Sequence, residues 1–408
     1  MLHSKISDLY SNSYYRGWSD LHIQEGFPLS YRNKNGTILK YDDESLNYDD
    51  INSLFDFDIK SELKRLNGDI DRALELKNNE SSPRFRCNIH FFNGQKVGLV
   101  MRLINDTVPD IDNLGLPPLA RTFNKKSTGL VLVTGATGSG KSTTLAAMIE
   151  ELNNSEACHI VTVEDPIEYV YKPNMAKITQ REIGQEKDSI SFSQSLRAAL
   201  RQDPDVILVG EIRDMETANM CLEAAQTGHL VFGTLHTKDS IGTVNRFIQM
   251  FPPSEKNKIR GTLADSLIGV ISQVLVPKKG GGKVMACEVL GIDMAAKSIM
   301  ADNEKQIHEL GRSFELNVAT NGNITLNKSL LDLTIKNVIS PETAMDFCVN
   351  SIDMKKRLKA NNISVDSFSE DVPQVEATTQ KEDNKVPESN NRNGSGRGLF
   401  NSLSSKKN

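Results

Sequence analysis

Apolar runs and amphipathic stretches alternate along the chain from residue 119 to residue 360. Short apolar runs predict five strands in this region, at residues 130–134, 159–163, 206–209, 230–234 and 284–289. The first three are almost continuously apolar, which is typical of strands buried on both faces. Between Asp214 and Gly228, apolar residues recur at helical spacing, and these two residues are a suitable N-cap and a suitable C-terminal stop. This alternation predicts an α/β fold in which helices cover both faces of a parallel sheet.

The two ends of the chain have different patterns. Residues 1–104 contain short segments of alternating polarity separated by Asn-Gly turns, which predicts a small α+β domain with an antiparallel sheet. Residues 105–118 hold several helix breakers and are predicted to be an interdomain linker. Residues 361–408 are rich in Ser, Asn, Glu, Lys and Gly and are predicted to form a disordered tail. The second domain is therefore predicted to span residues 119–360.

Composition and charge exclude several classes of protein. The sequence has 408 residues and a formal net charge of −5, which argues against a dedicated nucleic-acid binder. No apolar run approaches the roughly 20 residues that cross a bilayer, and the polar start lacks the apolar core of a signal peptide. The five cysteines are scattered without a C-x-x-C pair, so we interpret them as reduced structural thiols. A cytosolic location is predicted, and any membrane association would come through a partner.

A glycine-rich segment follows the first of these strands and has the G-x-x-x-x-G-K-S pattern of a phosphate-binding loop. Its backbone N–H groups and the start of the next helix are suited to bind phosphate oxygens. Lys141 is expected to reach the β- and γ-phosphates, and the Ser142 hydroxyl to bind Mg²⁺. The predicted nucleotide-binding residues are Gly135, Ala136, Thr137, Gly138, Ser139, Gly140, Lys141, Ser142 and Thr143. The segment predicts a nucleoside triphosphate site, without showing how its energy is used.

Carboxylates follow two further strands. Glu211 ends the apolar run 206–209 after one glycine, the arrangement of a Walker B strand that places an acid beside the metal ion. Glu164, Asp165 and Glu168 lie just past residues 159–163. Clustered like charges raise the pKa of at least one member, which suits proton abstraction. From the residues alone, this cluster is equally well explained as an acidic surface turn.

Four motifs together resemble a known family. They read TGATGSGKS at 134–142, EDPIE at 164–168, DPDVILVGEIRD at 203–214 and GHLVFGTLHT at 228–237. In order and spacing they are similar to the type II/type IV secretion ATPase superfamily, and within it to the PilT-like type IV pilus retraction ATPases. Weaker likeness covers residues 15 to 355. The resemblance implies a PAS-like N-terminal domain joined to a RecA-like ATPase domain, with six subunits in a ring.

The resemblance also implies roles for the residues that match the motifs. Glu168 would be the general base and Glu211 the Walker B acid that binds the metal, with Glu164 supporting the acidic box. His229 and His236 fall on the family's histidine box, where they would sense the γ-phosphate and pass its state to the subunit contact. Because seven positions separate them along a strand, the two imidazoles are expected to point to opposite faces and not to share a metal ion.

Two arginines of the first domain complete the catalytic residues that the resemblance implies. Arg86 and Arg102 match positions whose guanidinium groups reach the nucleotide and stabilise the transition state. From the residues alone, both are ordinary arginines on the face of a strand. If the resemblance holds for them, they act only when the small domain closes over the loop, which links hydrolysis to motion.

The predicted function is that of a hexameric cytoplasmic motor that uses ATP and Mg²⁺ to drive pilus retraction. Its expected partners are five further copies of itself, an inner-membrane platform protein and a second motor ATPase, with no nucleic acid. A short N-terminal region and the missing four-cysteine zinc insert favour retraction. Against it, residues 294–302 lack the arginines of the family's Ala-Ile-Arg-Asn-Leu-Ile-Arg-like helix.

Alternative functions remain open at this stage. One is a related motor for pilus extension, conjugation or type IVB secretion, and another is a PilU-like accessory subunit that depends on a second motor. A nucleic-acid translocase on the same ATPase core is disfavoured by the acidic pI of 5.9. In the tail, three apolar residues within the basic segment 397–403 form a candidate docking motif for a partner.

Overall fold

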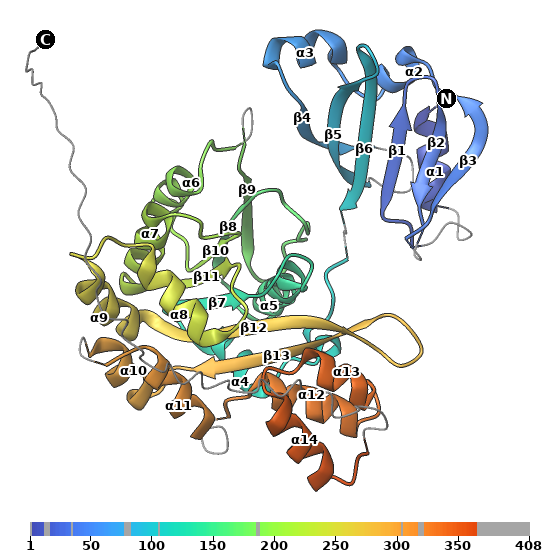
Figure 1. Ribbon diagram of the computed structural model, residues 1–408. Helices are drawn as coiled ribbons and strands as arrows, with labels where there is room; N and C mark the ends of the chain where they lie inside the picture. The colour runs from blue at the N-terminus through green and yellow to red at the C-terminus, as the bar shows by residue number, and fades with distance from the viewer. Residues whose placement is uncertain are drawn as a thin grey trace, which may run out of the picture. The chain divides into compact units, whose positions relative to one another are not determined.

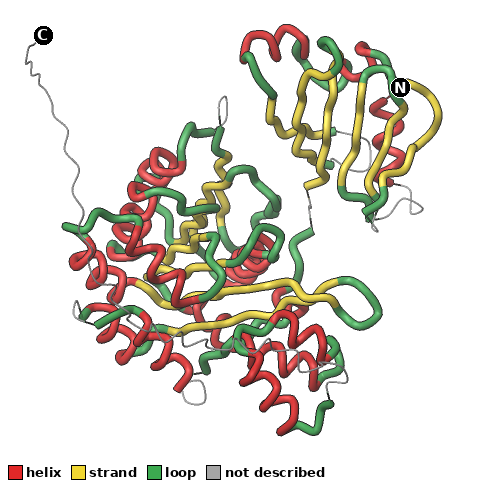
Figure 2. The backbone as a smooth tube through the Cα atoms, viewed as in Figure 1, coloured by secondary structure: helices red, strands yellow, loops and turns green. Residues whose placement is uncertain are grey.

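The computed structural model describes residues 2–11, 17–33, 36–76, 83–104, 107–184, 188–302, 305–316 and 322–364. Two β-sheets dominate this part of the chain, one in the N-terminal domain and one in the ATPase domain (Figures 1 and 2). The candidate docking motif at residues 397–403 and most of the predicted tail lie outside the described residues.

The described residues of the N-terminal domain form a six-stranded antiparallel sheet with three helices. Its strand order is β3-β2-β1-β6-β5-β4, and every neighbouring pair is antiparallel. Alternate residues of the central strands, such as Phe85 and Cys87 of β5, are fully buried in a core of their own. The elements are α1 Leu2–Ser11, β1 Asp20–Gln24, β2 Pro28–Arg32, β3 Ile38–Ser45, α2 Tyr48–Asn52, α3 Ile59–Leu66, β4 Ile70–Glu75, β5 Arg84–Phe92 and β6 Lys96–Ile104. The predicted antiparallel sheet is confirmed.

The ATPase domain contains a seven-stranded sheet with the order β13-β12-β7-β11-β10-β8-β9. All neighbouring pairs are parallel except β12 and β13. Its strands are β7 Gly129–Thr134, β8 His159–Glu164, β9 Lys177–Glu182, β10 Val206–Val209, β11 Leu230–Leu235, β12 Leu267–Pro277 and β13 Lys283–Gly291. The predicted α/β fold is confirmed, and the sheet departs from the predicted parallel arrangement at one edge, where β12 turns back directly into β13 through a short glycine-rich connection.

Helices cover both faces of this sheet. The α-helices are α4 Pro118–Thr122, α5 Lys141–Ser155, α6 Phe192–Ala199, α7 Met215–Gln226, α8 Ser240–Gln249, α9 Lys256–Ser266, α10 Met294–Ala301, α11 His308–Leu316, α12 Leu326–Ile335, α13 Pro341–Phe347 and α14 Ser351–Ala360. Two short 3₁₀ helices, Ile111–Leu114 and Phe123–Lys125, flank α4. Among the described helices, none is long and apolar enough to cross a membrane.

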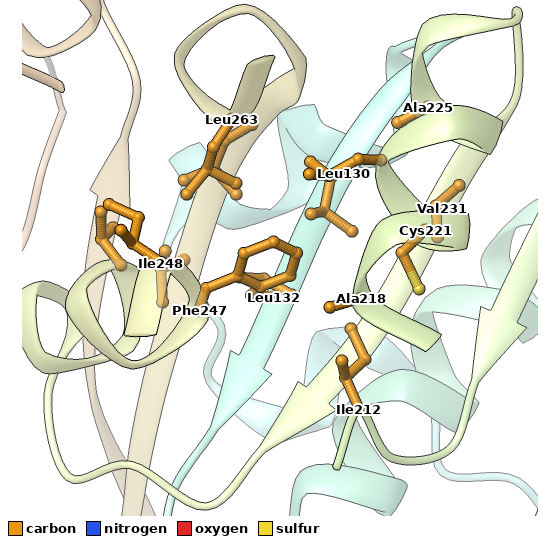
Figure 3. Packing of buried hydrophobic residues seen from close by; sticks show 14 of the residues in the cluster. Leu130, Leu132, Ile212, Ala218, Cys221, Ala225, Val231, Phe247, Ile248 and Leu263 are labelled. Atoms are coloured by element: carbon orange, nitrogen blue, oxygen red, sulfur yellow. The ribbon is translucent and has the colours of Figure 1, made fainter. Parts of the chain in front are cut away.

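The central strand β7 separates two hydrophobic cores. Leu130 and Leu132 point into the core formed with α7, α8 and α9, where Phe247 and Leu263 pack against them (Figure 3). Val131 and Val133 point the other way, into the core under α5. Every residue of β7 is buried, which explains its continuous apolar sequence. The strand is thus held rigidly at the point where the phosphate-binding loop begins.

The segment predicted as a linker contributes to the second of these cores. Ile111 and Leu116 are buried and belong to the core that lies under α5. The described part of this segment therefore packs as part of the ATPase domain, and where the domains divide stays a prediction.

Candidate active site

The phosphate-binding loop connects β7 to α5. Gly140 occupies the N-cap of α5 with a φ of 90°, a left-handed conformation that glycine adopts without strain. Gly138 also has a positive φ, of 76°, and a Cβ added there would meet no atom within 4 Å. No side chain caps the helix, so its first N–H groups remain available to an anion. This geometry fits the phosphates of a nucleotide.

The loop is held by contacts within it and from β12. Lys141 Nζ donates to the carbonyl oxygens of Gly135 at 2.9 Å and Ala136 at 3.2 Å. Burial lowers the pKa of Lys141, although the carboxylates of Glu211 and Glu168 oppose this shift. Those two carboxylates therefore lie close enough to the lysine to interact with its charge.

Gln273 supports the loop from outside. Its Nε2 donates to Ser139 O at 2.8 Å. A Cβ on Gly135 would lie 2.4 Å from the Gln273 carbonyl oxygen, so no larger residue fits where the strand enters the loop. The buried Ser139 Oγ has no hydrogen-bond partner among the described residues. This hydroxyl is thus a further group available to hydrogen-bond with a bound ligand.

The acid after β10 has two polar neighbours. Arg213 donates to Glu211 Oε2 at 2.7 Å, and His236 Nε2 lies 3.4 Å from Glu211 Oε1. The hydrogen bond from Arg213 is the largest cause that lowers the pKa of Glu211. The carboxylate is therefore held in its charged form, as binding of a divalent cation together with the Ser142 hydroxyl would require.

The acidic box follows β8, and its two glutamates differ in environment. Glu164 is buried and accepts hydrogen bonds from Thr162 Oγ1 at 2.6 Å and Gln180 Nε2 at 3.3 Å. Burial raises the pKa of Glu164 to about 7. Its carboxylate also accepts a hydrogen bond from the backbone N–H of Glu168, whose own side chain is exposed. Glu164 thus fixes the turn from which Glu168 projects.

One cleft brings most of these residues together. The carboxyl ends of β7, β11, β10 and β8 are adjacent in the sheet, so the segments that follow them converge at one edge. The cleft is lined within the ATPase domain by the phosphate-binding loop and by residues from each of these strand ends: Glu164, Asp165, Glu168, Glu211, Thr234 and His236. The motifs read from the sequence therefore form one continuous surface.

Within a single chain, His229 lies outside this cleft. It precedes β11, whereas His236 follows it, and six residues of extended strand place them about 20 Å apart. His229 Nδ1 hydrogen-bonds with Ala224 O at 2.9 Å, at the end of α7. The two histidines are thus separated by the length of a strand rather than by its two faces. The part of His229 in sensing the γ-phosphate stays a prediction.

Arg86 and Arg102 face each other in the N-terminal sheet. They are register partners on β5 and β6, and both are exposed. Arg102 Nε donates to Asp20 Oδ1 at 2.8 Å, which orients one of the two guanidinium groups. Their action on a bound nucleotide stays a prediction.

Sequence reasoning missed three residues that shape the cleft. Arg213 lies within one of the motifs but was assigned no role in the sequence analysis. Its position two residues after Glu211 could have indicated the contact with that carboxylate. Tyr169, whose hydroxyl lies 3.0 Å from Thr143 Oγ1, directly follows the acidic box. Gln273 is more than a hundred residues from the loop and had no local signal.

Comparison with known proteins identifies the family of the chain. A family model described as type II/IV secretion system protein matches residues 64–339, so the chain belongs to this family. It is 40% identical over 348 residues to the type IV pilus retraction ATPase PilT of Pseudomonas aeruginosa, covering 84% of this chain and 97% of that protein. It is 41% identical over 298 residues to a twitching motility protein of Neisseria gonorrhoeae, covering 73% of this chain and 77% of that one.

A solved structure supports the same conclusion. The pilus retraction motor PilT with bound ADP superposes with a TM-score of 0.77 and 36% identity, covering 86% of this chain and 99% of that one. The fold and the family define the chain as an ATPase. It is PilT-like in sequence and in fold, as the motifs indicated.

Proposed function

We propose that this chain is the subunit of a hexameric motor that hydrolyses ATP with Mg²⁺ to retract a type IV pilus. The observation that carries the proposal is its likeness to PilT over 97% of that protein's length. The cleft supports it, because one edge of a sheet bears a phosphate-binding loop, a charged metal-binding acid and an acidic turn.

In this proposal each residue of the cleft has a distinct task. Lys141 and the first N–H groups of α5 bind the phosphates, while Ser142 and Glu211 would hold Mg²⁺. The cation would neutralise phosphate charge when bound. Glu168 accepts the proton of the attacking water, because it is exposed whereas Glu164 is buried and its Oε1 is engaged by two other donors.

The N-terminal domain would complete the site. Arg86 and Arg102 supply positive charge to the transition state when the domain closes over the nucleotide. Sequential closure in six subunits would distort the ring and apply force to an inner-membrane platform protein. The motor would thus act in the cytoplasm, peripheral to the membrane through its partners, with a second motor ATPase as a further partner.

The sequence of helix α10 favours a second candidate function, which is that of a motor for extension or secretion, or of an accessory subunit. Helix α10 begins at Met294, and Asp293 caps it by accepting from Ala296 N at 2.7 Å. Its sequence, MAAKSIMA, has none of the arginines found in the corresponding helix of retraction motors. Arg260 of α9 instead donates to carbonyl oxygens at the C-terminal end of α10, including Met300 O at 2.9 Å.

Deletion of the gene in its native host, followed by electron microscopy of surface filaments, tests the proposal. Excess pili that do not retract are expected. Bald cells would show an extension motor, and unchanged filaments would favour an accessory or secretion role. Complementation with the Lys141→Ala variant is the control, because it supplies the protein without its nucleotide-binding lysine.

A further inference from the structure

A buried carboxylate outside the nucleotide cleft lies where two helices begin. Glu288 of β13 is 8% exposed and belongs to neither the phosphate-binding loop nor the acidic box. Its Oε1 accepts a hydrogen bond from Ser240 N, the first residue of α8, at 2.8 Å. The backbone N–H of Leu326, the first residue of α12, also interacts with this carboxylate and lowers its pKa. One side chain thus joins the N-termini of two helices.

A row of polar residues connects Glu288 to the phosphate-binding loop. Thr134, Ser272 and Glu288 are register partners across the adjacent strands β7, β12 and β13. Thr134 Oγ1 lies 2.7 Å from Ser272 Oγ, which lies 3.5 Å from Ser240 Oγ. Thr134 is the last residue of β7, immediately before Gly135 of the loop.

Helix α8 is connected to the loop in a second way. Thr243 of α8 is fully buried, and its Oγ1 donates to Thr134 Oγ1 at 3.3 Å. Thr237 Oγ1 lies 2.6 Å from Thr243 Oγ1. Thr237 directly follows His236, whose imidazole lies beside Glu211. The first turn of α8 therefore touches the base of the loop and the segment that carries His236.

Glu288 is buried beside specific donors that favour its charged form. Burial raises the pKa of Glu288, while the donors at Ser240 and Leu326 lower it. A buried carboxylate is retained at low cost only where such donors surround it, and removal of its charge leaves those donors without their acceptor. The two helix starts and the carboxylate therefore depend on one another.

We propose that Glu288 is a positioning residue for ATP hydrolysis, which couples the phosphate-binding loop and His236 to the C-terminal helix α12 through α8. Glu288 does not contact the nucleotide cleft. It fixes the first turns of α8 and α12 relative to each other, so that a shift of the loop is transmitted to α12. This goes beyond the proposed retraction function, since it applies to the ATPase cycle whatever the motor moves.

Glu288→Gln tests the coupling with little change in volume. The amide keeps one acceptor oxygen but loses the charge and replaces the second oxygen with an N–H donor, so it no longer holds the N–H groups of both Ser240 and Leu326 as the carboxylate does. We expect the kcat for ATP to fall about tenfold through misplaced reacting groups, while the KM for ATP changes less than about twofold. Glu342→Gln, at an exposed position on α13, is the matched control and should keep the wild-type kcat. An unchanged kcat in folded Glu288→Gln protein would overturn the proposal.

If Glu288→Gln fails to fold, Ser240→Pro offers a second test, because it removes the donor of the hydrogen bond from Ser240 N to Glu288 Oε1. Proline is tolerated at the first position of a helix, and Asp239 before it is already extended, with φ −147° and ψ 165°. The variant removes the N–H that Glu288 accepts while leaving the carboxylate in place. We expect a similar loss of kcat, and a double variant no slower than either single variant. Fully multiplicative losses in the double variant would refute the coupling.

Hydrogen exchange separates coupling from a merely structural role. In the wild type, Mg²⁺ and ADP should change amide protection in both residues 237–249 and residues 325–335. In either variant, only residues 237–249 should respond. A wild-type response of residues 325–335 in the variants, or none in the wild type, would contradict the transmission of loop movement to α12.

Discussion

The buried carboxylate of Glu164 makes the stability of the ATPase domain depend on pH. Its pKa is raised from 4.5 to about 7, chiefly because burial disfavours the charged form. A shift of this size corresponds to about 3 kcal/mol of unfolding free energy. Below pH 4.5 the group is protonated in both the folded and unfolded states, so it costs nothing. Between pH 4.5 and about 7 the unfolded chain loses this proton while the folded state retains it, so stability falls, and it levels off above about pH 7 where the folded state also ionises.

Glu164→Gln removes this titration while keeping a similar shape. The difference in unfolding free energy, variant minus wild type, should therefore increase by about 3 kcal/mol between pH 4.5 and about pH 8. The amide also loses some hydrogen bonds from Thr162, Gln180 and the Glu168 N–H, which shifts the whole curve without changing its pH dependence. The slope against pH, rather than the value at one pH, is the quantity to measure.

Urea unfolding across this pH range, followed by far-ultraviolet circular dichroism in the absence of nucleotide, measures the difference. Trp18 is the only tryptophan of the sequence and lies in the N-terminal domain, so its fluorescence follows that domain separately. Glu223→Gln, on the exposed surface of α7, is the matched control and should give a difference that does not vary with pH. A difference for Glu164→Gln that is equally constant would refute the reasoning.

Two further predictions concern nucleotide binding and the N-terminal domain. Lys141→Ala should weaken the binding of a fluorescent ADP analogue about tenfold or more, because charge-assisted hydrogen bonds to phosphate are lost; affinity equal to that of a Lys126→Ala surface control would contradict the assigned role. Arg86→Ala should lower ATP turnover, by about a thousandfold if it acts as an arginine finger, with an unchanged melting temperature because Arg86 is exposed. A turnover equal to that of Arg65→Ala, an exposed arginine of α3, would mean that the N-terminal domain does not complete the site.

The sequence predicted the strands that are buried on both faces and missed others. The strand β7 has every residue buried, so its apolar run identifies it. The edge strand β9 has only one buried residue among six, and its polar sequence KITQRE gave no strand signal. The long strand β12 directly follows α9, and a continuous apolar run of that kind does not distinguish a strand from a helix.

Local motifs located the loop, the two acids and His236, because each follows a strand that ends at the same edge of the sheet. Contacts made by long-range pairing were beyond local patterns. Ser272 meets Thr134 across 138 positions of sequence, and Glu288 reaches Ser240 across 48. Neither pair has a spacing that sequence reasoning could detect, and both depend on the register of β12 and β13.

The assignment of Glu168 as the general base is the central chemical claim of this account. Glu168→Gln should bind ATP with near wild-type affinity and hydrolyse it at least about a hundredfold more slowly in a single turnover. Glu164→Gln should retain more activity, since its role is to hold the turn. The opposite result, with full turnover in Glu168→Gln and loss of turnover in folded Glu164→Gln, would contradict the account and identify Glu164 as the base.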